Sequence, residues 1–82
     1  MEEKPIGEVT HFFGHISVAI VKFNKKVSVG DVIHFKGAHT DFSQTIDSMQ
    51  YEHQEIKDAK KGQEVGIKVK EKVREGDEVY AA

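Results

Sequence analysis

The residues best suited to chemistry lie in one short basic segment near the C-terminus. In residues 67–74, charged and β-branched side chains alternate except at Glu71, so an extended chain would bury Ile67, Val69 and Val73. The opposite side would then carry a row of cations about 6.6 Å apart. That row consists of Lys68, Lys70, Lys72 and Arg74. Such spacing suits the phosphates of an extended single strand, so the row is a candidate RNA-binding site.

Other side chains could extend or cancel this site. Three lysines earlier in the chain could form a second basic bank: Lys22, Lys25 and Lys26. Tyr51 is the aromatic residue that we expect to be exposed and able to stack on a base. A solvated strand edge is the alternative, because lysines on an edge discourage pairing with other chains and Glu71 and Glu75 could neutralise the row.

Catalysis and metal binding find little support elsewhere in the sequence. His11 and His15 could meet across a hairpin, but two ligands do not make a zinc site. Asp31 and Asp77 each follow a glycine in the same context, so we expect them to bond to the backbone of a turn rather than to act as acid or base. No serine has a histidine partner in a recognisable nucleophile motif. We predict no catalytic residue, no metal and no cofactor.

A repeated motif marks the turns that must position these side chains. An apolar residue, two variable residues, a glycine, a polar residue, one more variable residue and an apolar residue follow one another in residues 27–33 and 73–79, with a looser copy in 59–65. Glycine can take a positive φ without steric cost, and a short polar side chain can bond back to the turn. Each copy is therefore predicted to turn the chain into a new strand.

Short runs of β-branched and aromatic residues separate these turns, and no window has the spacing of an amphipathic helix. The runs predict strands at 6–13, 16–23, 27–29, 32–35, from 42 onward, from 65 onward and at 78–81, with a helical turn at 58–62. The five phenylalanines are expected to fill the core. The predicted fold is therefore all-β. Because an open sheet would expose two edges, we predict a small closed antiparallel β-barrel of six to seven strands.

Length and composition set further limits. The 82 residues predict a single domain spanning 1–82, with residues 1–5 as a flexible tail. With 38% hydrophobic and 32% charged residues the chain is neither disordered nor a membrane span, and it has no cysteine. An acidic N-terminus without an apolar run behind it predicts a cytoplasmic protein rather than a secreted one. The formal charge of −2 argues against strong nonspecific attraction to nucleic acid or lipid.

Taken in order, several motifs resemble domain II of the translational GTPases. They are Gly30-Asp31 with the run behind it, Ser48-Met49-Gln50, Val65-Gly66-Ile67 after a glycine turn, and Gly76-Asp77. The resemblance covers nearly the whole chain and implies a β-barrel that contacts RNA, the ribosome or neighbouring domains. The nucleotide-binding motifs of a GTPase are absent, so no nucleotide is expected. The aminoacyl-tRNA pocket of elongation factor Tu is not preserved at Ser48, Tyr51 and Glu64.

We therefore predict a non-enzymatic, translation-factor-like binding module that contacts RNA or a ribonucleoprotein through its basic strand. The alternative is a protein-interaction module that docks to a separately encoded enzyme or factor. The same barrel is also appended to enzymes outside translation, including some peptidase-family proteins that act in RNA-modification pathways. The chain could thus be a fragment of an enzyme whose activity lies elsewhere.

Overall fold

The structure, a computed structural model, describes residues 4–82. Over this range the chain forms ten β-strands and no helix, so the all-β prediction is confirmed. The strands are β1 (Gly7–Phe13), β2 (Val18–Phe23), β3 (Val27–Ser28), β4 (Val32–Lys36), β5 (Asp41–Thr45), β6 (Met49–Tyr51), β7 (Gln54–Ile56), β8 (Asp58–Ala59), β9 (Glu64–Lys68) and β10 (Glu78–Ala81). No helix in this range could cross a membrane.

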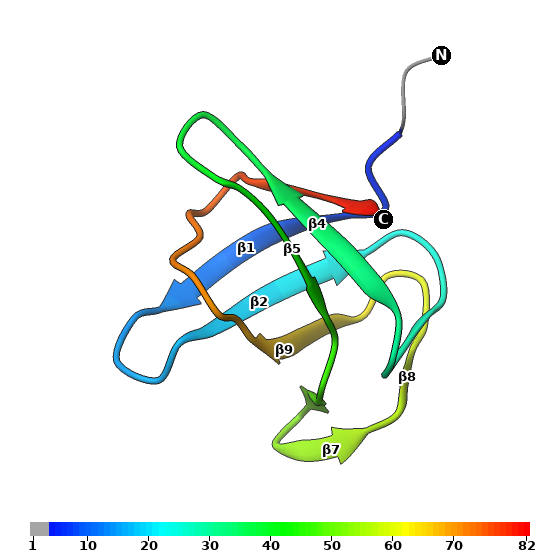
Figure 1. Ribbon diagram of the computed structural model, residues 1–82. Coiled ribbons are helices and arrows are strands. Elements are labelled where there is room, and N and C mark those ends of the chain that lie inside the picture. The colour runs from blue at the N-terminus through cyan, green and yellow to red at the C-terminus, as the bar shows by residue number, and fades with distance from the viewer. Residues whose placement is uncertain (1–3) are drawn as a thin grey trace.

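Eight of the strands form one curled antiparallel sheet, in the order β5-β4-β10-β1-β2-β9-β6-β7 (Figure 1). The short strands β3 and β8 pair with each other in a separate ladder. The large sheet ends at β5 and β7, which do not pair. The prediction of a closed barrel of six to seven strands is therefore wrong, and the fold is an open, half-barrel sheet.

The sheet does not close into a barrel because the chain turns a corner after β5. The predicted single strand from Phe42 is two strands, and Ile46 between them exchanges backbone hydrogen bonds with Gly30 and Asp31. The gap between β5 and the end of β9 is bridged by a side chain instead of a ladder. The Gln44 amide donates to the carbonyl of Lys68 and accepts from the N–H of Lys70, both at 2.9 Å. Gln44 is buried, so these two bonds satisfy its amide away from water.

The repeated motif forms turns of one construction, as predicted. Gly30, Gly62 and Gly76 have φ angles of 98°, 87° and 91°, near the value that a type II turn needs at its third position. In each turn the residue after the glycine donates its N–H to the carbonyl three residues earlier, and its side chain accepts from the N–H of that same residue. The pairs are Asp31 with Ser28, Gln63 with Lys60, and Asp77 with Arg74.

The phenylalanines do not all lie in the core. Phe23 and Phe35 are fully buried, Phe12 and Phe42 pack against the core from partly buried positions, and Phe13 is 49% exposed. The cause is a β-bulge in β1 between Val9 and His11. An extra residue in one strand reverses the alternation beyond it, so Phe12 turns toward the core and Phe13 toward solvent.

Two smaller predictions concern residues 58–62 and the N-terminal tail. The predicted helical turn at 58–62 is wrong, because Asp58 and Ala59 form β8 and the turn follows at 60–63. Of the predicted tail, residues 1–3 lie outside the described range. The carbonyl of Pro5 accepts a hydrogen bond from the side chain of Asn24 at 3.1 Å, so this end of the tail is held against the β2–β3 turn.

Candidate docking site

The basic segment is not the straight row that an extended chain would give. Strand β9 ends at Lys68 and the backbone bends at Lys70 and Glu71. Beyond the end of β9 the N–H of Val69 donates to the carbonyl of Ser17, and the N–H of Lys70 donates to the side chain of Gln44. Ile67, Val69 and Val73 are buried as predicted, and the four cations are exposed. Lys68, Lys70, Lys72 and Arg74 are therefore solvated, but not evenly spaced along one strand.

The other proposed RNA contacts are separated from this segment. Lys22 lies on β2, in register with Glu8 on one side and Glu64 on the other, so carboxylates flank it across both ladders. Lys25 and Lys26 lie in the β2–β3 turn. Tyr51 is half-buried and packs against the core, so it is not the exposed stacking platform that we expected. The geometry does not test whether these side chains contact RNA, and that assignment stays a prediction.

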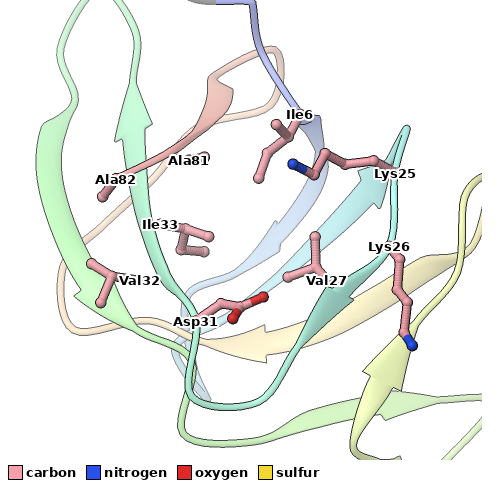
Figure 2. A pocket seen from close by; sticks show the side chains of 9 residues that line it. All are labelled: Ile6, Lys25, Lys26, Val27, Asp31, Val32, Ile33, Ala81 and Ala82. Carbon is pink, nitrogen blue, oxygen red and sulfur yellow. The ribbon is translucent and has the colours of Figure 1, made fainter.

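Lys25 and Lys26 instead line a hollow at the end of the molecule where β1 begins and β10 ends. The hollow has a volume of about 200 Å³ (Figure 2). Its other lining residues are Ile6, Val27, Asp31, Val32, Ile33, Ala81 and Ala82. The sheet curl brings these residues together from four separate parts of the chain. No sequence pattern indicated this hollow, because its walls meet only through long-range pairing.

The floor of the hollow is apolar and its rim is charged. Ile6, Val27 and Ile33 are buried core residues, whereas Val32 is 45% exposed at the rim. Figure 2 shows the Lys25 ammonium group turned across the mouth, while that of Lys26 points away from it. Within residues 4–82 Lys25 forms no ion pair. An apolar floor with an unpaired cation at the mouth suits a ligand that combines an apolar side chain with a carboxylate.

A second polar cluster lies on the outer face of β4 and β5. His34 Nδ1 lies 2.7 Å from Ser43 Oγ, and His34 Nε2 lies 2.6 Å from Asp41 Oδ1. The sequence shows no serine with a histidine partner in a recognisable nucleophile motif, and we did not predict this contact between Ser43 and His34. The hairpin register could have revealed the contact, because a turn at residues 37–40 pairs Lys36 with Asp41 and therefore His34 with Ser43. A catalytic triad relies on a buried carboxylate, and the Asp41 side chain is 75% exposed.

The end of β1 and the β1–β2 turn carry the largest exposed apolar side chains among the described residues. Phe13 is 49% exposed and Ile16 is 60% exposed, and His11 stacks on Phe13 with ring centroids 6.3 Å apart. His11 also contacts Glu75 at 3.1 Å, with both side chains more than half exposed. No group of three metal-ligating side chains occurs within residues 4–82. We call Phe13 and Ile16 the hairpin tip.

Comparison with known proteins places the chain outside translation. No protein-family model matches it. It is 40% identical over 76 residues to an "uncharacterized protease" of Methanocaldococcus jannaschii, covering 92% of this chain and 19% of that protein. It is 34% identical over 77 residues to a collagenase of Porphyromonas gingivalis, covering 21% of it. The chain thus spans about a fifth of the length of these curated relatives.

The fold is that of a solved domain of similar size. Two crystal structures of the C-terminal domain of a "putative U32 peptidase" from Geobacillus thermoleovorans are 24% identical to the chain. Their TM-scores are 0.88, covering 94% of this chain and 98% of the domain, and 0.89, covering 98% and 92%. At this identity the likeness establishes a shared fold and not a shared function.

These comparisons correct the sequence-based identification. The relatives and the solved domains are described as a protease, a collagenase and a U32 peptidase, so the assignment to domain II of the translational GTPases is wrong. The prediction of a translation-factor-like, RNA-contacting module is contradicted with it. The motifs that suggested it encode glycine turns and strand starts, which small antiparallel sheets need whatever they bind. The comparisons favour the alternative, a module that docks to an enzyme.

Proposed function

We propose that the chain is a non-catalytic accessory domain that docks to the larger part of a U32-peptidase-like protein, whether the two are fused or separate. One observation carries the proposal. The chain covers 98% of a separately crystallised C-terminal domain, yet it covers only 19% of the Methanocaldococcus protease to which it is 40% identical. A unit that folds on its own and recurs within a much longer protease has the properties of an appended binding domain.

The chemistry of the described residues supports a binding role over a catalytic one. The single Ser, His and Asp cluster that we find on β4 and β5 has a solvated carboxylate. In water-exposed surroundings a carboxylate stabilises an imidazolium weakly, because solvent screens the charge. By contrast, two exposed apolar features, the hollow and the hairpin tip, are available to pack against a protein.

Docking can be tested with the Methanocaldococcus protease from which the matched 76-residue segment has been removed. We expect the chain to bind this truncated protein in trans, measured by isothermal titration calorimetry. The full-length protease is the matched control and should not bind, because its own segment would already occupy the docking surface. Failure to bind the truncated protein, or equal binding to both forms, would contradict the proposal.

The non-catalytic part of the proposal has its own test. The isolated chain should release no more peptide from gelatin or casein than buffer alone, measured with a fluorescent amine reagent. Hydrolysis above that level that disappears in Ser43→Ala would overturn it, because Ser43 is the hydroxyl that contacts His34.

A further inference from the structure

We infer that the hollow is the surface that receives the partner, and that it takes an apolar side chain flanked by carboxylates. The inference rests on the proposed function, since it names the surface and the chemistry of that docking. The occupant to which it commits is a segment of the larger, peptidase-like polypeptide. Three features of the structure support it: the position of the hollow, a Lys25 ammonium group that forms no ion pair within residues 4–82, and an incompletely covered apolar wall.

The position of the hollow is the first feature. Ile6 both lines the hollow and directly precedes β1, so the chain enters the domain along the wall of the hollow. In the Geobacillus protein this fold is a C-terminal domain, so the rest of that protein joins it on the N-terminal side. A partner that arrives from this side meets the hollow first. The hairpin tip lies at the other end of the seven-residue strand β1 (Figure 1). An extended strand of this length spans about 20 Å.

The charges at the mouth are the second feature. The charged side chains that line the hollow are Lys25, Lys26 and Asp31. The Asp31 carboxylate already accepts the backbone N–H of Ser28 at 2.9 Å. The Lys25 ammonium group has no ion-pair partner within residues 4–82 and is turned across the opening (Figure 2). A carboxylate on the partner would form an ion pair with this ammonium group. Opposite charges on facing surfaces also orient the partners and speed their association.

The apolar wall is the third feature. Val32 belongs to β4 and is 45% exposed, although it adjoins the buried Ile33 and the hollow. The floor beneath is formed by Ile6, Val27 and Ile33, which are buried members of the hydrophobic core. A preformed apolar recess with an exposed aliphatic rim is where a single anchor side chain from a partner gains most from burial.

A matched pair of substitutions at exposed apolar residues tests whether the docking surface lies at the hollow. With the truncated Methanocaldococcus protease as probe, we expect Val32→Asp to raise the dissociation constant at least tenfold. Ile16→Asp, the same kind of change on a side chain that is 60% exposed at the hairpin tip, should leave it within twofold. Val32→Thr, which keeps the shape of the side chain, checks that an effect is not due to unfolding, and amide spectra of all variants verify the fold.

A matched pair of charge variants tests the chemistry. Lys25→Glu should weaken binding to the same probe several-fold more than Lys26→Glu, because only the Lys25 ammonium group crosses the mouth of the hollow (Figure 2). The two variants change the net charge equally and are adjacent in the chain, so a general electrostatic effect would weaken both alike. Equal losses would overturn the assignment of Lys25.

A peptide titration separates this inference from the proposed function. In amide-shift mapping, acetyl-Glu-Leu-Glu-amide should perturb Lys25, Val27, Val32 and Ala81, and acetyl-Lys-Leu-Lys-amide and acetyl-Glu-Ser-Glu-amide should not. Shifts at Phe13 and Ile16, or no shifts, would overturn the hollow as a site. If the truncated protease fails to bind while the peptide perturbs the hollow, the proposed function fails and the binding chemistry stands. If the truncated protease binds but Val32→Asp does not change the dissociation constant, the hollow is not the docking surface and the proposed function stands.

Discussion

The turns at Asp31 and Asp77 are built from the same motif and placed in different surroundings. Both have a glycine at positive φ and an aspartate that accepts the N–H of the residue three positions earlier. Asp31 is exposed at the rim of the hollow. Asp77 is 5% exposed, and its carboxylate also accepts the hydroxyl of Thr40 at 2.5 Å. The sequence motif therefore determines the turn, and the neighbours determine what the carboxylate does.

The difference shows how one local motif can serve stability in one place and remain available for binding in another. Asp77 connects the turn before β10 to the β4–β5 loop, where Gly37 packs against its carboxylate so closely that a side chain would overlap it. Among the described residues, the Asp31 carboxylate bonds only within its own turn, to the N–H of Ser28. We expect the Asp77 turn to be sensitive to substitution and the Asp31 turn to tolerate it.

Asp77→Ala should have the largest effect on stability, lowering the free energy of unfolding by about 2–3 kcal/mol. The reason is that the buried Thr40 hydroxyl and the Arg74 N–H would both lose their acceptor. Urea denaturation followed by circular dichroism measures the loss. Asp77→Asn, which keeps one acceptor oxygen, is the control and should lose less. A loss for Asp77→Ala no greater than that for Asp31→Ala would remove the distinction between the two turns.

Gly37→Ala should cost about 2 kcal/mol, because the new methyl group would overlap the Asp77 carboxylate and force the loop to move. The same substitution in an Asp77→Ala background should cost clearly less, since the overlapping atoms are gone. A double-mutant cycle by urea denaturation gives this coupling directly. Additive losses would show that Gly37 is required for another reason.

Gly76→Ala and Gly30→Ala should each cost about 1 kcal/mol, because both glycines have positive φ and an L side chain is strained there. No neighbouring atom lies within 4 Å of the position of either new side chain, so burial should not distinguish them. Equal shifts in the urea midpoint would confirm that the backbone of the two turns is the same. A much larger loss at Gly76 would instead mean that the buried surroundings constrain the backbone as well.

The turns were predictable from sequence because each is complete within a few residues. The glycine, the polar side chain and the N–H that it binds lie within four positions of one another, as in residues 28–31. The contact between His34 and Ser43 was also within reach, because the hairpin register determines it. What these features share is that no distant part of the chain has to be known.

The open sheet and the hollow could not be predicted for the opposite reason. Whether β5 pairs with another strand depends on the corner at Ile46 and on Gln44 reaching residues 24 and 26 positions away. The bulge in β1, which exposes Phe13, is visible only against β2. The hollow requires Ile6, Lys25, Val32 and Ala81 to converge through the curl of the sheet. Local sequence patterns carry no information about such contacts between distant residues. For the same reason, turn motifs similar to those of another family led to the wrong family assignment.

Asp31→Ala should have the smallest effect on stability, about 0.5 kcal/mol, because an exposed turn can exchange its side-chain acceptor for water. The same substitution should strengthen peptide binding although it lowers stability. Removing a carboxylate from the rim of the hollow leaves Lys25 as the charge at the mouth, so the affinity for acetyl-Glu-Leu-Glu-amide should rise about twofold. Amide-shift titration measures the affinity and urea denaturation the stability. A variant that loses both stability and affinity would show that Asp31 shapes the hollow, and the two turns would then differ less than their exposure indicates.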